Sequence, residues 1–332
     1  MVKSKNDLDI SVLIATYNRA EILRRTLESM TVLERDGLSV EFVVVDNNSS
    51  DHTKEVIESF VDRLTIRYLF EPRPGKNCAL NKALNEVQLG KLVVFTDDDV
   101  VPQEDWLKAI VAACEKWPNY SVFGGGTYLI WPKTAIPSWA RCCSVHGWGF
   151  GLHDVSMKSE RPYHSNGHPS GANFWLRREL LDSGRRYDEA IGPRPGKNFA
   201  MGSETSFFRQ LAADGYSTMY IPNAVVGHRV PVELLSKRAI RKRAYRYGRG
   251  FPYRGLPRSV LMNKHFILWW FIRIGAIAKC IIKYGLVMLF SSRDKRVAGS
   301  TQVIKWIAYN VESLKIASRI RKEQLFHRNR KR

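Results

Sequence analysis

The chain has 332 residues, 44% of them hydrophobic and only 14 of them proline. This length and apolar content exclude an intrinsically disordered protein and allow one large domain with a substantial extension. The formal net charge is +20, but residues 1–230 hold 27 Lys and Arg against 28 Asp and Glu, whereas residues 231–332 hold 25 against 4. The positive excess therefore lies after Val230, where we predict a functional boundary.

Five cysteines form an odd set without a CxxC pair. This count argues against a disulfide framework and favours a reducing compartment. The N-terminal residues run into a strand pattern without the apolar stretch of a secretory signal, so we expect a cytoplasmic protein.

The first part of the chain alternates predicted strands and helices. Apolar runs predict strands at 10–15, 40–45, 65–70 and 92–96, and helical spacing predicts helices at 19–30, 53–60, 77–87 and 106–117. A Gly-interrupted strand follows at 121–130, then a long segment at 131–170, helices near 178–183 and 203–213, and a short last strand at 218–221. The alternation predicts an α/β fold with a Rossmann-like, mostly parallel sheet covered by helices on both faces. The long segment is typical of a lid or a substrate surface.

Three consecutive aspartates, Asp97, Asp98 and Asp99, directly follow the predicted strand at 92–96. They therefore stand at its C-terminal end, where open α/β sheets place their ligands. Like charges at this spacing repel and need a cation or a proton. Oxygen ligands suit Mg²⁺ or Mn²⁺ shared with a phosphate group, and a solvated turn is the alternative explanation.

Two further polar segments end predicted strands at the same sheet edge. The segment 15–19 (Ala-Thr-Tyr-Asn-Arg) follows the first strand, and Asp46 follows the second. An acid after the second strand can accept hydrogen bonds from a base or a ribose, although Asp46 also suits a turn or a helix cap. The first turn carries no glycine, which argues against a dinucleotide-binding cradle.

Charged residues begin two of the predicted helices. Arg73, Lys76 and Asn77 stand at the start of one helix, where a basic side chain can meet phosphate oxygens or belong to a solvated loop. Glu204 lies in the first turn of the helix at 203–213. The helix dipole stabilises a carboxylate there, and the same carboxylate can act as a general base toward an incoming hydroxyl.

The order of these segments is more informative than any one of them. Along the chain come the segment 15–19, the run 43–51 ending in Asp-Asn-Asn-Ser-Ser-Asp, the segment 77–81, the run 95–99, Gly171-Ala172-Asn173 and Gly202-Ser203-Glu204. The series resembles family 2 inverting glycosyltransferases of the GT-A fold over about residues 8–230. The resemblance implies a GT-A domain at 1–230, a nucleotide-diphosphate sugar as donor (a UDP-sugar favoured) and Mn²⁺ or Mg²⁺ as cofactor.

The resemblance also implies roles for individual residues. The positions that match base and ribose binding are Ala15, Thr16, Tyr17 and Asp46. The expected donor site also includes Arg19, Lys76, Asn77, Asp97 and Asp98. Asp97 would face the ribose and Asp99 the metal-bound diphosphate, while Asp98 could share either role. Asp99, Asp97 and the candidate His228 are the expected metal ligands.

The acceptor side is implied by the later motifs. Glu204 matches the acid of the family's Gly-Glu-Asp motif, which acts as the catalytic base, and Gly171, Ala172, Asn173 and Ser203 would lie on the acceptor side. Ser203 stands where an acid is common in the family. The histidines at 146, 153, 164 and 168 have no metal-ligand spacing and receive no role.

The basic C-terminal part, residues 231–332, is predicted to be a partly apolar helical extension. Its run 266–290 is mostly apolar but includes Arg273, Lys279 and Lys283, which are costly inside hydrocarbon. Lys279 and Lys283 fall on one side of a helix, which favours an interfacial helix facing anionic lipid headgroups. A second such segment is predicted at 303–320. The alternative is a helical subdomain that packs residues 268–271 onto the core.

We therefore predict a metal-dependent hexosyl- or related transferase, associated with the inner face of the cell membrane and acting on a lipid-linked or saccharide acceptor in cell-surface polysaccharide or glycolipid synthesis. Two alternatives remain, a catalytically inactive nucleotide-sugar-binding or scaffold protein and a basic nucleic-acid-binding protein. The basic segments alternate with long apolar runs and carry no nucleic-acid-binding motif, which favours the membrane over nucleic acid as partner.

Overall fold

The computed structural model describes residues 8–152, 158–164, 167–196, 199–254, 266–290 and 292–329. The chain forms two compact units. The first contains Met1–Lys133, Phe150–Pro195 and Ser203–Val230, and the second contains Thr134–Gly149, Gly196–Gly202 and Pro231–Arg332. The second unit thus adds two short segments to the basic extension that begins after Val230.

The first unit is built on one mixed sheet. Its strands are β1 (Ile10–Thr16), β2 (Val40–Asp46), β3 (Ile66–Phe70), β4 (Leu92–Asp97), β5 (Val100–Pro102), β6 (Val122–Ile130), β7 (Arg161–Pro162), β8 (Phe174–Arg177) and β9 (Thr218–Arg229). Their order is β3-β2-β1-β4-β8-β6-β9-β5, with β7 paired to β9. The long ladders β1–β2, β1–β4, β2–β3 and β6–β9 are parallel, so the predicted mostly parallel sheet is confirmed.

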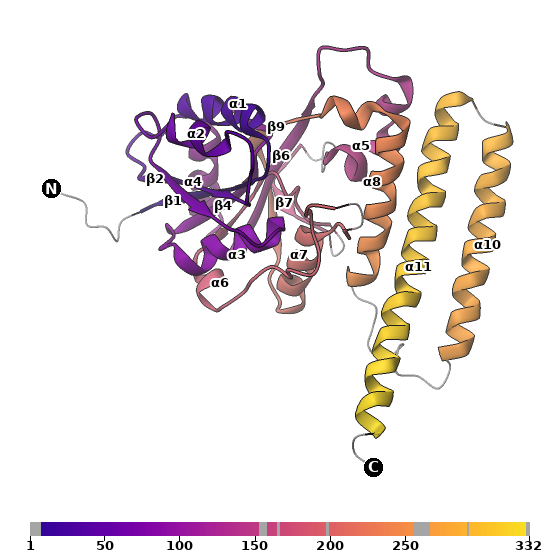
Figure 1. The fold of residues 1–332 in the computed structure, drawn as a ribbon. Coiled ribbons are helices and arrows are strands. Elements are labelled where there is room, and N and C mark those ends of the chain that lie inside the picture. The colour runs from indigo at the N-terminus through magenta and orange to yellow at the C-terminus, as the bar shows by residue number, and fades with distance from the viewer. Residues whose placement is uncertain are drawn as a thin grey trace. The chain divides into compact units, whose positions relative to one another are not determined.

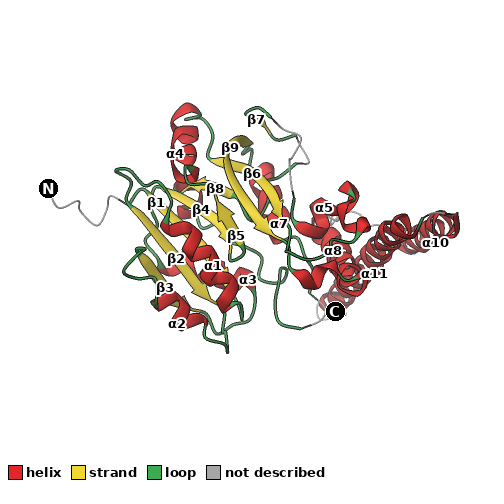
Figure 2. Ribbon diagram, turned by 90° about the horizontal axis from the view of Figure 1, so that it is seen from above, coloured by secondary structure: helices red, strands yellow, loops and turns green. Residues whose placement is uncertain are grey.

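Helices cover both faces of this sheet, as predicted (Figures 1 and 2). Buried residues of α1 (Ala20–Thr31), α2 (Thr53–Glu58) and α4 (Trp106–Lys116) pack on one face, and those of α3 (Lys76–Glu86), α6 (Glu179–Asp182) and α7 (Ser203–Ala213) pack on the other. Successive strand residues point to opposite faces, so Val12 joins the first cluster and Leu13 the second. This two-sided burial explains why the strands read as continuous apolar runs.

The parallel register brings the polar strand ends together. Ala15 lies opposite Val45 on one side and Asp97 on the other, and Thr16 lies opposite Asp46. The ends of β1, β2 and β4 therefore meet at one edge of the sheet, where the sequence motifs predicted a ligand site.

Two parts of the first unit differ from the sequence-based expectation. The last strand, predicted at 218–221, is the longer β9, and His228 lies within it rather than after it. Pairing with both β6 and β5 extends the strand, because each partner supplies backbone hydrogen bonds beyond residue 221. The segment 131–170, expected to be irregular, contains the 3-10 helix η1 (Ser138–Arg141), α5 (Cys143–Phe150) and β7.

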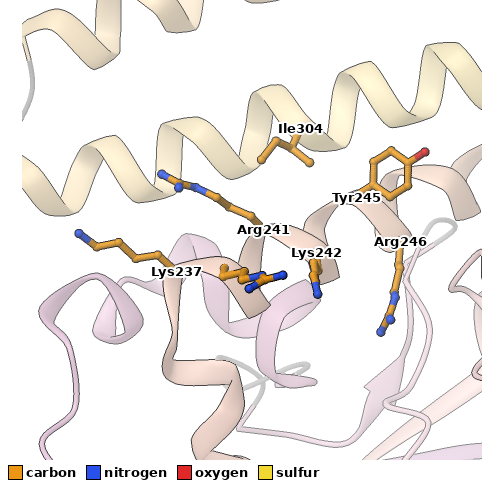
Figure 3. A pocket seen from close by; sticks show the side chains of 7 residues that line it. Lys237, Arg241, Lys242, Tyr245, Arg246 and Ile304 are labelled. Atoms are coloured by element: carbon orange, nitrogen blue, oxygen red, sulfur yellow. The ribbon is translucent and has the colours of Figure 1, made fainter. Parts of the chain in front are cut away.

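The second unit is helical. Its C-terminal elements are η2 (Val232–Leu235), α8 (Lys237–Gly250), η3 (Phe251–Arg254), α10 (Phe266–Phe290) and α11 (Arg293–Asn329), and α11 packs against both α8 and α10. α8 turns Ile240, Ala244 and Gly248 inward, while its basic residues lie on the remaining surface (Figure 3). A Cβ on Gly248 would lie 2.3 Å from the carbonyl oxygen of Lys305, so glycine permits the close approach of α8 to α11.

The predicted second interfacial segment, 303–320, belongs to α11 and packs within the second unit. Ala308, Asn310, Ser313 and Ala317 are buried there. Glu312 is also buried and accepts hydrogen bonds from Arg249 at 2.8 and 3.0 Å. These contacts turn part of the segment toward the rest of the second unit, while Trp306 of the same segment is 46% exposed; contact of this segment with a membrane therefore stays a prediction.

α10 exposes an apolar face. Phe271 is 64% and Ile282 65% exposed, and Ile274 and Ile281 lie between them at helical spacing. The alternative that residues 268–271 pack onto the core does not hold for Phe271, which is exposed; the side chains of 268–270, like that of Lys283, lie outside the described part. Within the described residues, no helix is both long and apolar enough to span a bilayer.

Candidate active site

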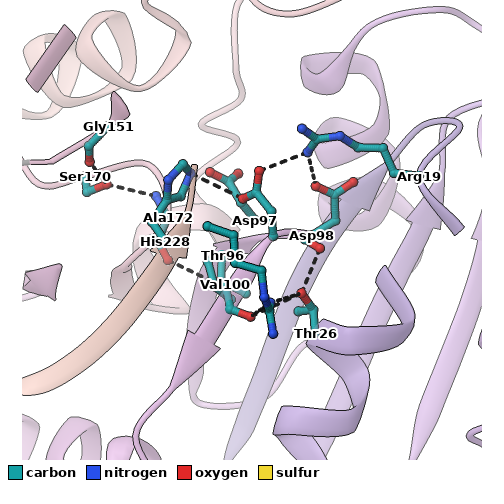
Figure 4. Close-up of polar contacts among 12 residues, drawn as sticks. Arg19, Thr26, Thr96, Asp97, Asp98, Val100, Gly151, Ser170, Ala172 and His228 are labelled. Carbon is teal, nitrogen blue, oxygen red and sulfur yellow. Dashed lines mark hydrogen bonds and ion pairs between the residues drawn. The ribbon is translucent and has the colours of Figure 1, made fainter. Parts of the chain in front are cut away.

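The aspartate triplet lies at the end of β4, and its middle member is the most enclosed. Asp98 is buried and accepts hydrogen bonds from the Thr16 hydroxyl at 2.8 Å and the Arg19 guanidinium at 2.5 Å. Its carbonyl oxygen accepts from the hydroxyl of Thr26 on α1 (Figure 4). Burial raises the pKa of Asp98 to about 6, even though Arg19 opposes the shift.

Asp99 shares the same arginine and adds a histidine. Its carboxylate lies 3.1 Å from Arg19 Nη1 and 3.2 Å from His228 Nε2. Burial alone would raise the pKa of Asp99, but His228 and Arg19 outweigh burial and hold it below its usual range. Arg19, shared between Asp98 and Asp99, offsets part of the repulsion between these adjacent carboxylates.

Asp97, the first aspartate of the triplet, pairs with a lysine. Lys76 Nζ, at the start of α3, lies 2.6 Å from Asp97 Oδ1 and 3.1 Å from Glu204 Oε1. Burial would lower the pKa of Lys76, but the two carboxylates outweigh it and raise the pKa. One ammonium group therefore joins the aspartate triplet to the predicted catalytic acid, although the two are far apart in the sequence.

Glu204 is half-buried in the first turn of α7. Burial would raise the pKa of Glu204, but the Lys76 charge and a backbone hydrogen bond outweigh it, so the pKa is lowered and the carboxylate is ionised at neutral pH. A Cβ on Gly171 would lie 2.7 Å from Glu204 Oε1. Glycine at 171 therefore leaves the room that the Glu204 side chain occupies.

Asp97, Asp99 and His228 form a group of metal-ligand type. One donor atom from each lies within 4.8 Å of the others. Two carboxylate oxygens and an imidazole nitrogen fit a divalent cation. The group brings together the three residues that the sequence motifs named as metal ligands.

The residues expected around the base and ribose surround the ends of β1 and β2. Thr16 and Asp46 are buried, and Tyr17 is exposed beside them. Asp46 accepts hydrogen bonds from the Ser49 backbone and the Tyr68 hydroxyl at 2.8 and 3.3 Å. Burial, together with Asp46, raises the pKa of Tyr68 to about 12. Asp46 thus holds the turn after β2 as well as standing at the predicted site.

Four candidates lie inside the fold rather than at its surface. Asn77 is buried and donates to the carbonyls of Asp188 and Ile191, which positions that loop. Ser203 is buried, and the carbonyl of the buried Ala172 accepts from Thr96. Asn173 is fully buried, and its amide contacts the carbonyls of Gly126 and Ala224 and the Trp106 indole at 2.8–3.0 Å. The buried amides of Asn77 and Asn173 therefore hold backbone segments in place and do not face a ligand.

The family model described as "Glycosyl transferase family 2" matches residues 11–184, more than half of the chain. The chain belongs to glycosyl transferase family 2. This membership confirms the resemblance seen in the ordered motifs.

Two curated relatives are similar over most of this glycosyltransferase, and a third over about a quarter of it. Glycosyltransferase AglE of Haloferax volcanii is 24% identical over 275 residues, covering 81% of this chain and 82% of the relative. The succinoglycan biosynthesis protein ExoM of Rhizobium meliloti is 26% identical over 250 residues, 73% of each chain. A Campylobacter jejuni protein named GalNAc(5)-diNAcBac-PP-undecaprenol beta-1,3-glucosyltransferase is 33% identical over 93 residues, 27% of this chain and 29% of the relative.

Solved structures establish the fold. The mannosyltransferase PcManGT from Pyrobaculum calidifontis, solved with GDP-Man and Mn²⁺, aligns with a TM-score of 0.56 at 18% identity, covering 93% of this chain and 88% of the other. At this identity the likeness concerns the fold, and it confirms the predicted GT-A architecture. The glycosyltransferase therefore has a known transferase fold.

Replacing Asn173 with Ala should lower the free energy of unfolding of the glycosyltransferase by at least about 3 kcal/mol. The change leaves the Trp106 indole N–H and two buried carbonyls without their partner, and each such loss costs about 1–3 kcal/mol. Urea unfolding would measure the effect. The exposed Asn85, which bonds Arg186, is the matched control, and Asn85→Ala should change stability by less than about 0.5 kcal/mol.

Several contributors to the site carry no recognisable sequence signal. Thr26 bonds the Asp98 and Val100 carbonyls from α1, and Arg229 also reaches the Val100 carbonyl at 2.6 Å. His168, given no role from the sequence, bonds the hydroxyl of Thr205 next to Glu204 at 2.9 Å. These residues come from distant parts of the chain, so only the folded arrangement identifies them.

Proposed function

We propose that this glycosyltransferase moves a sugar from a nucleotide-diphosphate sugar to an acceptor hydroxyl with inversion at the anomeric carbon. The observation that carries the proposal is the Lys76 bridge, since one ammonium contacts both Asp97 of the triplet and Glu204 of α7. The donor carboxylates and a candidate base therefore flank the same small volume, as a single displacement requires.

Glu204 is the proposed general base. It would accept the proton of the acceptor hydroxyl while that oxygen bonds to the anomeric carbon. The bond from the anomeric carbon to the diphosphate oxygen breaks on the opposite side, and the electron pair leaves with the nucleoside diphosphate. The lowered pKa of Glu204 keeps it ready to accept this proton.

The proposed donor site uses the residues at the strand ends. Ala15, Thr16, Tyr17 and Asp46 would hold the base and ribose, and Asp97, Asp98, Arg19 and Lys76 would face the sugar diphosphate; Asn77 supports Lys76 from inside the fold. Asp97, Asp99 and His228 would hold Mn²⁺ or Mg²⁺. When bound, the ion would offset the negative charge on the leaving diphosphate.

The proposed acceptor is a lipid-linked or cell-surface saccharide at the inner face of the membrane. The name of the Campylobacter relative specifies a lipid diphosphate acceptor, and that of ExoM a polysaccharide. The exposed apolar face of α10 and the net charge of residues 231–332 suit peripheral contact with an anionic membrane. Gly171 and Ser203 lie next to Glu204 on the side proposed for the acceptor.

A thermal-shift panel of nucleotide sugars, each with and without Mn²⁺, tests the proposal. We expect one donor, with UDP-sugars as first candidates and GDP-mannose included, to raise the melting temperature only when Mn²⁺ is present, because ligand binding to the native state stabilises it. If no donor gives a metal-dependent shift, the proposal is wrong. Transfer of labelled sugar to extracted lipid-linked saccharides would then identify the acceptor.

The panel also separates the two alternatives. Donor binding without transfer to any acceptor of a broad set would favour an inactive scaffold protein. Salt-sensitive nucleic-acid binding without donor or vesicle binding would favour a nucleic-acid-binding protein.

Replacing Lys76 with Met should move the acid limb of the kcat/KM profile to higher pH. Lys76 lowers the pKa of Glu204, whereas burial raises it, so without Lys76 the base becomes protonated at a higher pH and activity is lost earlier on acidification. A pH–rate profile measures the shift. Lys82→Met is the matched control on the same helix, because Lys82 pairs with Glu86 instead and should leave the limb in place. An unmoved limb in Lys76→Met would contradict the assignment.

A further inference from the structure

The second unit contains a basic pocket on α8. A cavity of about 700 Å³ is lined by Lys237, Arg238, Arg241, Lys242 and Arg246, together with Tyr245 and with Ile304 of α11 (Figure 3). The α8 residues recur at i and i+4, so they occupy one side of the helix, away from its buried side at Ile240 and Ala244. Sequence spacing and packing together concentrate five cations around one cavity.

The positive charge of this pocket is not offset nearby in the sequence. Between residues 234 and 293 the chain contains no Asp or Glu. Within the part that the structure describes, the four cations that precede Tyr245 form no ion pair with a carboxylate; Arg241 instead donates to the Ser300 hydroxyl at 3.3 Å. Cations gathered without carboxylate partners repel one another, and an anion bound among them would relieve that repulsion.

The lining chemistry favours phosphate. Arginine presents a fork of N–H donors that matches phosphate oxygens, and lysine adds a compact charge. Tyr245 contributes to the lining of the same cavity. A volume of about 700 Å³ lies in the range of small-molecule sites and exceeds what a single phosphate needs. The combination suits a diphosphate with an attached sugar better than the single phosphate of a phospholipid headgroup.

The same unit also carries the apolar surface that a lipid would require. α10 exposes Phe271, Ile274, Ile281 and Ile282, and α10 packs on α11, which supplies Ile304 to the pocket. One helical unit thus combines a cavity lined by basic residues with a face suited to hydrocarbon. A soluble sugar phosphate would use only the first of these features.

We propose that the α8 pocket binds the diphosphate that joins a saccharide acceptor to its lipid. This inference rests on the proposed glycosyltransferase function and specifies its acceptor as a lipid-linked diphosphate. The pocket would hold the lipid end of the acceptor by charge, separately from the donor residues of the first unit.

Binding of the full-length protein to vesicles tests this proposal. Three vesicle types are compared: phosphatidylcholine alone, phosphatidylcholine with a polyprenyl diphosphate, and phosphatidylcholine with phosphatidylglycerol at equal total charge. We expect the diphosphate vesicles to bind at least about tenfold more tightly than the phosphatidylglycerol vesicles, and inorganic diphosphate to compete. The double variant Arg238→Glu/Lys242→Glu should lose this preference.

A charge-matched variant separates the pocket from general electrostatics. Lys315→Glu/Lys322→Glu reverses two exposed charges of α11 outside the cavity and should weaken all anionic vesicles alike while keeping the preference for diphosphate. Because all four positions are exposed, circular dichroism should show each variant folded. Equal binding to both anionic vesicle types would contradict diphosphate binding in the α8 pocket. A preference for diphosphate vesicles that persists in Arg238→Glu/Lys242→Glu would contradict it as well.

The donor panel keeps the two proposals apart. If a nucleotide sugar stabilises the protein with Mn²⁺ while diphosphate vesicles show no preferential binding, the result contradicts diphosphate binding in the α8 pocket. The same result still supports the proposed glycosyltransferase function. If no nucleotide sugar raises the melting temperature, the proposed glycosyltransferase function is contradicted. A preference for diphosphate vesicles would then show only that the protein binds lipid.

Discussion

Replacing Glu204 with Gln should reduce sugar transfer by about 10²–10⁴-fold while leaving donor binding nearly unchanged. Gln keeps the shape of the side chain but accepts no proton from the acceptor hydroxyl, and general-base catalysis contributes about this factor. The hydrogen bond from Lys76 can still be made to the amide oxygen, so the arrangement of Lys76 and Asp97 should persist. Initial rates with labelled donor measure the first effect, and thermal shift with donor and Mn²⁺ measures the second.

Glu86 supplies the control for this substitution. It pairs with Lys82 at 2.7 Å on the exposed side of α3, so Glu86→Gln removes a lysine-paired carboxylate outside the site and should leave turnover unchanged. Turnover of Glu204→Gln close to that of the unmodified protein would exclude Glu204 as the base. A loss of donor binding equal to the loss of rate would instead assign Glu204 to the donor site.

Replacing Asp99 with Asn should abolish the dependence of donor binding on Mn²⁺ and reduce kcat/KM by about 10²–10³-fold. Asp99 is buried, meets His228 at 3.2 Å and belongs to the group of donor atoms that fits a divalent cation. A bound metal ion contributes several kcal/mol of charge stabilisation, and each 1.4 kcal/mol corresponds to about a tenfold change in rate. Calorimetric titration with Mn²⁺ and the donor would measure the loss directly.

Two further variants test the specificity of the Asp99 effect. His228→Ala removes one neutral ligand and keeps both carboxylates, so its loss of Mn²⁺ affinity should be smaller. Asp182→Asn removes an exposed carboxylate that pairs with Arg178 on α6 and should change neither metal binding nor rate. Mn²⁺-dependent donor stabilisation that survives in Asp99→Asn would contradict the proposed ligand set.

Local sequence patterns predicted the sheet edge because the relevant information is contiguous there. The runs that form β1, β2 and β4 are apolar and end in polar residues, and a parallel register necessarily aligns those ends. Glu204 was likewise predictable as a residue of the first turn of α7. These predictions needed only the period of the apolar residues and the place where each run stops.

Burial was not predictable in the same way. Asn173 and Asn77 were expected to face ligands, yet the structure places their amides against backbone carbonyls. The sequence alone does not distinguish a polar residue that binds a ligand from one that donates a hydrogen bond to a buried carbonyl. The length of β9 was missed for a related reason, since its second half is a strand only because β5 and β6 pair with it.

Membership of glycosyl transferase family 2, the GT-A fold and the separation of charge at Val230 follow from local sequence patterns and from their order along the chain. The pairing of Lys76 with both Asp97 and Glu204, the sharing of Arg19 between Asp98 and Asp99, and the meeting of Asp99 with His228 follow from contacts between residues far apart in it. Patterns of apolarity specify where strands and helices begin and end. Which charges meet, and how their pKa values move, depends on burial and distance, and these exist only once the chain has folded.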